Sequence, residues 1–403
     1  MDYIIGFFLA SSCSKFCKSR IYLTNPTVSK QLKVPAGGGR RSTQAMEVHF
    51  QEEILMDILN RLHVQSLLRF KCVSNFWKTL ISGPYFKMKH LKHAKNDENF
   101  QKFLICQLCP EDGIYSVYCC PLTLVQRAED VRKLDCPSDS KLWYCSISCC
   151  YDGLAIIEVC DSTVDKHHIL VLWNPSTGES IVLPDPEFPP KGVACLGLGY
   201  DSTSRDYKIF KVDEKKENGR KVPSEILALK SGSWRKIDKH PRDIRNELFG
   251  THSLAFVHGA FHWVGISRNY FVVSFNISNE VYREIPLPEQ IFLLNIGVSI
   301  LEEMLCVYST YDFLWENTFK LWVLKDYGGN KYWDALFTVG DPRIYKVVPK
   351  YRFADGEVQF WSMGFDGQSF RTSRGPFGLW PRADSFQKGF AFTESLISLK
   401  LLT

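Results

Sequence analysis

No apolar stretch of this 403-residue chain reaches the length of about 20 residues that a membrane-spanning helix requires. The sequence therefore predicts no transmembrane helix. Charge of one sign is also scarce, because 49 Lys and Arg residues against 44 Asp and Glu residues leave a formal net charge of only +5. A charge this small gives no electrostatic basis for nucleic-acid binding. We expect neither a membrane nor a nucleic acid among the partners.

The chain also lacks the short motifs of common catalytic sites. It contains no phosphate-binding loop, no Gly-x-Ser-x-Gly turn and no His-Glu-x-x-His metal motif. Gly197-x-Gly199 has neither the third glycine nor the following helix of a dinucleotide site. The sequence therefore predicts a non-catalytic protein with no catalytic residues, no cofactor and no metal.

The 14 cysteines do not form the regular framework of a small disulfide-bonded protein. They occur as scattered single residues and as neighbours, such as Cys119-Cys120, which point to opposite faces of a strand. We interpret them as reduced thiols of a cytoplasmic or nuclear protein. The alternative is a secreted protein, in which Asn276 of Asn-Ile-Ser would be a glycosylation acceptor.

Two groups of residues offer alternatives to a chain without ligand sites. His90 and His93 precede Cys106-x-x-Cys109 at a spacing that allows zinc, although a charged segment and a strand are the simpler interpretation. His258 and His262 are four residues apart, so both face the same side if they lie on one strand. We interpret this pair as buried or rim histidines, with ligand binding as the alternative.

The charged run at 213–220 is interpreted as a surface loop, with contact to a partner as the alternative. The tryptophans are interpreted as core residues rather than as binding anchors. Those considered are Trp173, Trp234, Trp263, Trp322, Trp333 and Trp361.

Residues 1–45 are basic and contain no acidic residue after Asp2. Such a composition is typical of organelle transit peptides. We favour a disordered or spurious leader, because Met46 stands just before the first clear helical pattern and can serve as the start.

A short helical segment follows at residues 46–93. Ile54, Leu55, Ile58, Leu59 and Leu62 recur at i, i+1, i+4, i+5 and i+8, which places one apolar stripe along three helical turns. Two further short helices are predicted, the last of them ending at Gly83-Pro84. A segment this small cannot bury so much apolar surface alone, so it packs on the rest of the chain or on another protein.

The segment resembles the F-box of plants. The resemblance rests on EEILMDILNRL at 52–62, VQSLLRFKCVS at 64–74, Trp77, and LIS at 80–82. It implies binding to the Skp linker protein and, through it, to the cullin of a ubiquitin ligase. The residues that the resemblance places at this contact are Ile54, Leu55, Ile58, Leu59, Leu62, Val64, Leu67, Leu68, Val73 and Trp77.

Two positions depart from the family pattern. Phe50-Gln51 replaces the usual Leu-Pro, and His63 replaces the proline that usually follows Arg-Leu. Losing a proline at a helix start costs about 0.4–1 kcal/mol. Each buried Leu or Ile contributes roughly 1.5–3 kcal/mol. We therefore expect weakened linker binding rather than its loss.

Residues 100–403 show the pattern of a large all-β domain. Aromatic residues make up 14% of the chain, and short apolar runs alternate with turn clusters. Hairpin turns begin at Asn174, Lys230, Asn276 and Lys325, roughly 45–55 residues apart, which is the period of a kelch-type blade. The predicted fold is α+β multidomain: a small helical segment followed by an irregular, kelch-like β-propeller, with a twisted sandwich as the alternative.

This part of the chain resembles the F-box-associated domain of plants. The resemblance rests on LWNPSTGE at 172–179, LGYD at 198–201 with DYKI at 206–209, GAFHW at 259–263, IPLP at 285–288 and ESL at 394–396. It implies that the β domain recruits a protein to be ubiquitinated. The residues that contact this target are unknown.

Together the two resemblances imply the substrate-recognition subunit of a Skp–cullin–F-box (SCF) ubiquitin ligase. Such an adaptor contributes proximity rather than covalent chemistry. One alternative is an F-box protein that acts outside a ligase, or a decayed copy. The other is a propeller-based oxidase, which needs a metal site of Tyr, His and Cys side chains. The sequence specifies neither the target nor the pathway.

Overall fold

The computed structural model describes residues 52–108, 113–122, 131–137, 142–160, 168–188, 194–214, 216–217, 220–221, 223–237, 244–248, 253–289, 291, 295–313, 316–329, 331–340, 347–362, 369–372 and 387–401. Predictions for residues 1–45, Phe50, Gln51 and Cys109 lie outside these ranges. Residues 50–403 form one compact unit. Within the described ranges, no helix combines the length and the apolar character that crossing a membrane requires.

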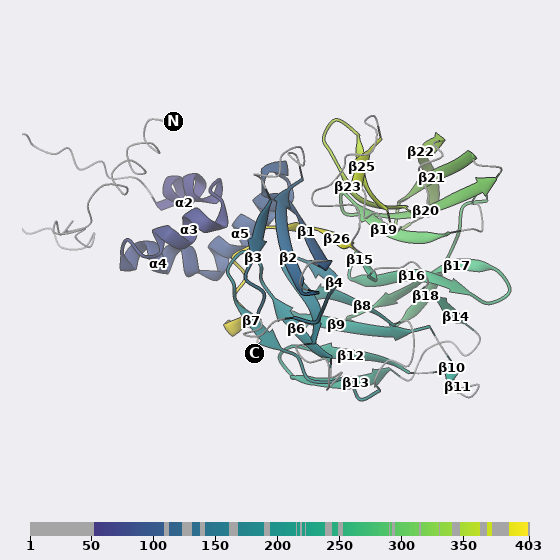
Figure 1. Ribbon diagram of the computed structural model, residues 1–403, viewed down its shortest axis with the longest axis horizontal. Helices are drawn as coiled ribbons and strands as arrows, with labels where there is room; N and C mark the ends of the chain where they lie inside the picture. Colours follow the sequence, from purple (N-terminus) through teal and green to yellow (C-terminus); the bar gives the residue numbers. More distant parts are fainter. Residues whose placement is uncertain are drawn as a thin grey trace, which may run out of the picture. The chain divides into compact units, whose positions relative to one another are not determined.

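Four helices form the first part of this unit (Figure 1). They are α2 (Glu52–Asn60), α3 (Val64–Phe70), α4 (Asn75–Ser82) and α5 (Pro84–Lys95), followed by the 3-10 turn η1 (Glu98–Phe100). Ser74 caps α4, because its hydroxyl accepts a hydrogen bond from the Trp77 backbone N–H at 3.3 Å.

The third predicted helix ends at Gly83, as expected, but the residues after it do not form a charged exit segment, because they fold into helix α5. Pro84 begins α5 instead, since a proline in the first turn loses no hydrogen bond that the helix needs. Phe86, His90 and Ala94 are spaced by four residues and buried, so they form the inner face of this lysine-rich helix.

After the helices, the described residues form strands that are arranged in six sheets and one two-stranded ribbon. The first sheet contains β26 (Gln387–Thr393), β1 (Gln101–Leu108), β2 (Tyr115–Pro121) and β3 (Arg132–Leu134). The second contains β4 (Tyr144–Tyr151), β5 (Leu154–Cys160), β6 (Ile169–Trp173) and β7 (Ser180–Val182). The third contains β8 (Ala194–Asp201), β9 (Asp206–Asp213), β12 (Ser224–Ala228) and β13 (Ser233–Ile237).

The fourth sheet contains β14 (Arg245–Glu247), β15 (Ala255–Val257), β16 (Ala260–Ile266), β17 (Tyr270–Asn276) and β18 (Tyr282–Pro286). The fifth contains β19 (Gly297–Leu301), β20 (Met304–Phe313), β21 (Glu316–Lys325) and β22 (Tyr332–Gly340). The sixth contains β23 (Val347–Arg352), β24 (Val358–Ser362) and β25 (Ser369–Arg371). The ribbon pairs β10 (Lys216–Glu217) with β11 (Arg220–Lys221), and the 3-10 turn η3 (Leu399–Leu401) ends the described chain.

The sheets form a closed ring. One edge strand of each sheet contacts an edge strand of the next: β26 with β4, β4 with β8, β8 with β15, β15 with β19, β19 with β23, and β23 with β26. All pairings within the sheets are antiparallel, including β26 on β1. This arrangement is a β-propeller, which confirms the predicted fold and excludes the twisted sandwich.

The hairpins recognised in the sequence are the third and fourth strands of four blades. They are β6–β7, β12–β13, β17–β18 and β21–β22. The first and sixth sheets were not recognised as units. The first sheet pairs Gln101 with Thr393, and no local repeat marks a pairing between the two ends of a chain.

Tryptophans pack within blades and also link them. Trp173, Trp263, Trp322 and Trp361 are buried, as predicted for core residues. Trp234 on β13 donates its indole N–H to the Pro184 carbonyl at 2.7 Å, and Trp333 on β22 donates to the Pro286 carbonyl at 2.6 Å. The same side chain at the same place in two blades therefore ties each blade to the preceding one.

The NPSTGE turn between β6 and β7 holds the C-terminal segment. The Asn174 amide donates to the carbonyls of Ser395 at 3.2 Å and Ile397 at 2.8 Å, and its oxygen accepts from the Ser176 N–H at 2.9 Å. The Glu179 carboxylate accepts from the Leu399 backbone N–H at 2.8 Å. This turn therefore acts as a clamp on residues 395–399.

Replacing Asn174 with alanine is expected to lower the free energy of unfolding by roughly 2–4 kcal/mol, because buried carbonyls of the C-terminal segment lose their donor. Urea unfolding followed by tryptophan fluorescence measures the change. Asn276→Ala is the matched control. Asn276 occupies the equivalent turn of the fourth sheet, but among the described residues its side chain bonds only the neighbouring N–H groups of Ser278 and Asn279. An equal loss in both variants would contradict the clamp.

Candidate partner-docking site

The four helices share a small apolar core with the end of the chain. Leu59, Val64, Leu67, Ile81 and Phe86 are each no more than 2% exposed and pack together. Leu396, from the segment after β26, belongs to the same core and is 2% exposed. The helical segment therefore completes its core with a residue of the C-terminal segment, because its own apolar content is too small to exclude water alone.

The ten residues predicted to contact a linker protein fall into three groups by exposure. Leu59, Val64 and Leu67 are buried in the helical core, so in this conformation they are not accessible to a partner. Ile54 is 47% exposed and Val73 is 63% exposed. The half-buried residues of this set are Leu55, Ile58, Leu62, Leu68 and Trp77.

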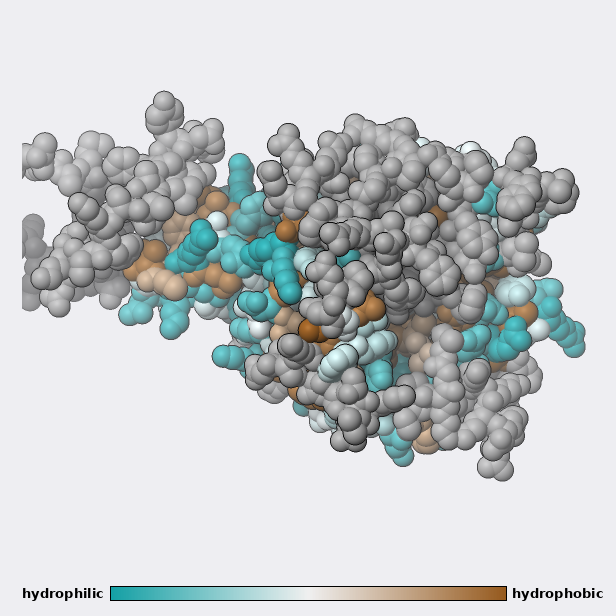
Figure 2. All heavy atoms as spheres, in the orientation of Figure 1, coloured by the Kyte–Doolittle hydropathy of each residue, from teal (hydrophilic) through white to brown (hydrophobic). Residues whose placement is uncertain are grey.

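Three further exposed apolar residues lie on the same helices and do not belong to the predicted set. Phe76 on α4 is 48% exposed, and Tyr85 and Met88 on α5 are 70% and 57% exposed. Five of the nine large apolar side chains that are exposed within the described ranges thus lie on the helical segment. Figure 2 shows brown, hydrophobic surface over these helices. Large exposed apolar surface is typical of protein–protein contacts.

The departure at His63 has a structural role. The His63 Nδ1 atom lies 3.0 Å from the Glu394 carboxylate, and its ring lies 4.8 Å from the Phe100 ring between centroids. Beside it, the Gln65 amide donates to the Ser176 carbonyl at 3.1 Å. The residue in the usual proline position therefore connects the start of α3 to the C-terminal segment.

The histidines and cysteines considered for zinc have other partners. The buried His90 donates from Nε2 to the Leu62 carbonyl at 3.0 Å, and burial lowers the pKa of its imidazole. The Cys106 thiol donates to the Cys145 carbonyl at 2.9 Å. Over the described part of the chain, no three His, Cys, Asp or Glu side chains are placed to hold a metal ion.

The pair His258 and His262 does not share a strand, which corrects the prediction. His258 has a φ of 52° and forms with Gly259 the two-residue turn between β15 and β16. Both rings nevertheless contact Tyr327 of the fifth sheet. The His258 and Tyr327 ring centroids are 4.6 Å apart, and the His262 Nε2 atom lies 2.8 Å from the Tyr327 hydroxyl.

His262 is a neutral link between the fourth and fifth sheets. Its Nδ1 donates to the Ala255 carbonyl at 3.3 Å, so its Nε2 accepts from the Tyr327 O–H group. Complete burial lowers the pKa of His262 to about 3. The buried site disfavours a charged imidazole, so the ring is uncharged in the folded chain at neutral pH.

The pH dependence of stability follows from His262. Its pKa is about 3 in the folded chain and about 6.5 when unfolded, so the unfolded state binds more protons between these values. Stability is therefore lost as pH falls below about 6.5, by about 2 kcal/mol between pH 6.5 and pH 5. Urea unfolding at pH 6.5 and pH 5 measures this change. Between these two pH values, the free energy of unfolding should fall less in His262→Gln than in the wild-type protein.

His90 acts in the same direction, so His262→Gln reduces the pH dependence without abolishing it. His168→Gln is the control, since His168 is partly exposed and beside Glu158 at 3.0 Å. An unchanged pH dependence in His262→Gln would contradict the neutral link.

The charged run at 213–220 is not only a surface loop. Its first residue, Asp213, is 4% exposed and accepts from Lys211 Nζ at 2.7 Å. Lys211 also donates to Glu225 at 3.2 Å and to the Phe188 carbonyl at 2.8 Å. Burial of such charges requires paired partners, so this group is a structural ion cluster beside the β10–β11 ribbon.

Comparison with known proteins agrees with this architecture. The profile of the F-box domain matches residues 49–89. The F-box protein CPR1 of Arabidopsis thaliana is 27% identical over 324 residues, which are 73% of this chain and 74% of that protein. An F-box/kelch-repeat protein of the same plant is 23% identical over 319 residues, covering 76% of this chain and 83% of that protein.

Among solved structures, TolB from Acinetobacter baumannii superposes with a TM-score of 0.45 at 10% sequence identity, over 76% of this chain and 71% of that chain. The profile of the F-box associated beta propeller domain matches residues 113–363, more than half of the chain. With a helical F-box in front of a closed ring of antiparallel sheets, the chain belongs to the F-box proteins that carry an F-box associated β-propeller domain.

Proposed function

We propose that this protein is the substrate-recognition subunit of an SCF ubiquitin ligase in the cytoplasm or nucleus. In this proposal α2 to α5 bind the Skp linker protein, and through it a cullin, while the propeller recruits a target protein. The observation that carries it is the exposed apolar surface of the F-box, on helices that are anchored to the propeller. The family's members are typically adaptors rather than enzymes.

The exposed residues have the composition of a binding surface. Phe76 and Tyr85 are aromatic, and Met88 is flexible and apolar. Aromatic residues dominate the energy of many protein interfaces, and methionine adapts to a partner's shape. Burying such side chains under a partner stabilises the complex by roughly 1.5–3 kcal/mol each before ordering costs.

The contacts between F-box and propeller suit an adaptor that acts by proximity. Leu396 packs in the core of the helices, while Glu394 and Ser176 bond His63 and Gln65 at the start of α3. These contacts restrict the motion of one binding surface relative to the other. A short, restricted connection raises the effective concentration of a bound target near the ubiquitin carrier.

Val73→Asp is expected to weaken binding of the full chain to a plant Skp linker protein by at least about tenfold, because it places a charge in an apolar contact. A titration of the purified proteins measures the affinity. Val182→Asp is the matched control: Val182 on β7 is 69% exposed, compared with 63% for Val73, and receives the same change on the propeller.

Equal effects of the two substitutions would exclude the predicted docking surface. Circular dichroism should show both variants folded, because neither side chain is buried. Leu59 is unsuitable for this test, since it is 2% exposed and its replacement by Asp would disrupt the helical core. No binding by folded wild-type protein would reject the ligase proposal and favour an F-box protein that acts outside a ligase.

A further inference from the structure

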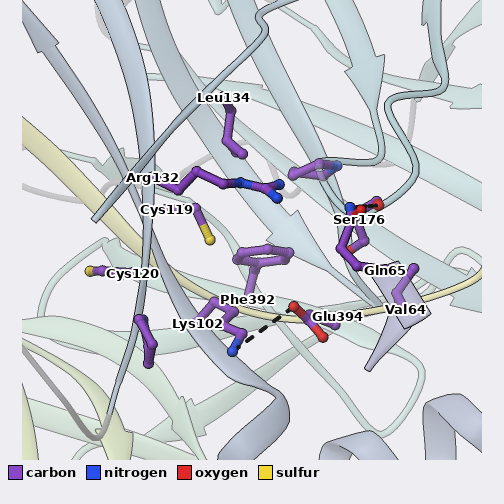
Figure 3. A pocket seen from close by; sticks show the side chains of 12 residues that line it. Val64, Gln65, Lys102, Cys119, Cys120, Arg132, Leu134, Ser176, Phe392 and Glu394 are labelled. Atoms are coloured by element: carbon purple, nitrogen blue, oxygen red, sulfur yellow. Dashed lines mark hydrogen bonds and ion pairs between the residues drawn. The ribbon is translucent and has the colours of Figure 1, made fainter. Parts of the chain in front are cut away.

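A cleft of about 180 Å³ lies where the F-box meets the first two sheets. Val64 and Gln65 at the start of α3 form one wall, and the turn at Pro175 and Ser176 forms the second. The rest comes from side chains of β1, β2, β3 and β26 in the first sheet and from Glu394, which follows β26 (Figure 3). The cleft is distinct from the exposed apolar surface of α4 and α5.

Strand register explains why the cleft is open. Leu104 pairs with Cys119, which pairs with Arg132, so these residues form one row across the first sheet. On the same face, Leu104, Val117 and Leu134 are covered by the second sheet. Near the F-box this cover ends, and Lys102, Cys119 and Arg132 face the cleft instead.

The cleft contains more positively charged side chains than negatively charged ones. In Figure 3 the Arg132 guanidinium extends into the cleft, and it has no hydrogen bond or ion pair with the described residues. Lys102 Nζ is 3.9 Å from one oxygen of Glu394, whose other oxygen is 3.0 Å from His63. The cationic side chains of Arg132 and Lys102 therefore share the cleft with one carboxylate, Glu394, which already lies close to Lys102 and His63.

The neighbouring thiol adds no negative charge. Burial raises the pKa of Cys119 to about 12, so it is neutral at physiological pH. The free guanidinium offers planar paired N–H donors, which match the two oxygens of a carboxylate or phosphate. The cleft is therefore electrostatically suited to an anion beside Arg132.

Most of the remaining lining is apolar, with Gln65 and Ser176 as its uncharged polar side chains. Phe392 lies beneath the Arg132 side chain in Figure 3, and Leu134, Pro175 and Val64 complete the walls. An apolar cavity of about 150 Å³ accommodates a single benzene-sized ring. A bulky ligand is excluded, since drug-sized pockets measure about 300–1,000 Å³.

We propose that this cleft binds a compact organic anion, whose carboxylate or phosphate pairs with Arg132 and Lys102 while an apolar ring or short chain lies on Phe392. The ligand touches Val64 and Gln65 of the F-box as well as the propeller, so binding stabilises the junction of the two. The proposal is independent of linker binding, because neither charged residue lies on the exposed apolar surface.

Benzoate and phenyl phosphate are suitable probes, with acetate and inorganic phosphate as probes that lack the apolar body. Titration calorimetry on the full chain is expected to show millimolar binding of the first two, and weaker binding of acetate and inorganic phosphate. Thermal unfolding should shift upward with probe concentration. Absence of binding by both aromatic probes, or equal binding of inorganic phosphate, would overturn the proposal.

Arg132→Gln should reduce the affinity for benzoate at least about tenfold, and Arg132→Lys should have an intermediate effect because it retains charge without paired donors. Lys133→Gln is the matched control. Lys133 is the next residue of β3, is exposed, and points to the opposite face of the sheet. Equal losses of benzoate affinity in Arg132→Gln and Lys133→Gln would mean that the overall positive charge attracts benzoate. That result would reject binding in the cleft. Binding only of a peptide with an acidic side chain would also reject a small-molecule site.

Discussion

Residues 387–399 make the contacts on which both parts of the protein depend. Strand β26 pairs with β1 from Gln101 to Gln107 and so completes the first sheet. Immediately afterwards, Asn174 and Glu179 hold the backbone at residues 395–399, and Leu396 enters the core of the F-box helices. Closing the propeller and completing the helical core are therefore achieved by one continuous segment.

This arrangement has a consequence for the function of an adaptor. A helical segment of about 45 residues has too little core to be rigid by itself. Because Leu396 and the contacts of His63 and Gln65 fix it to the propeller, the exposed apolar surface is presented by helices that do not need to order on binding. Preorganised surfaces lose less conformational entropy when a partner binds.

The blades are held to each other by recurring polar links as well as by apolar packing. Trp234 and Trp333 donate to proline carbonyls of the preceding blades, and Tyr327 bonds His262 across the fourth and fifth sheets. Local pattern revealed four hairpins because a strand, a glycine or asparagine turn and a second strand are adjacent in the chain. It did not reveal the first sheet, whose strands come from both ends, or α5, whose lysines obscure its buried face.

The sequence by itself determined the order of domains, the helical stripe, the blade hairpins and the family, because each depends on residues close together in the chain or on a motif. Only the tertiary structure decided which apolar residues are buried and which are exposed. Leu59 and Val73 belong to the same motif, yet one is 2% and the other 63% exposed. Exposure depends on which segments pack together, and the core that contains Leu59 includes Leu396, more than 300 positions away in the chain.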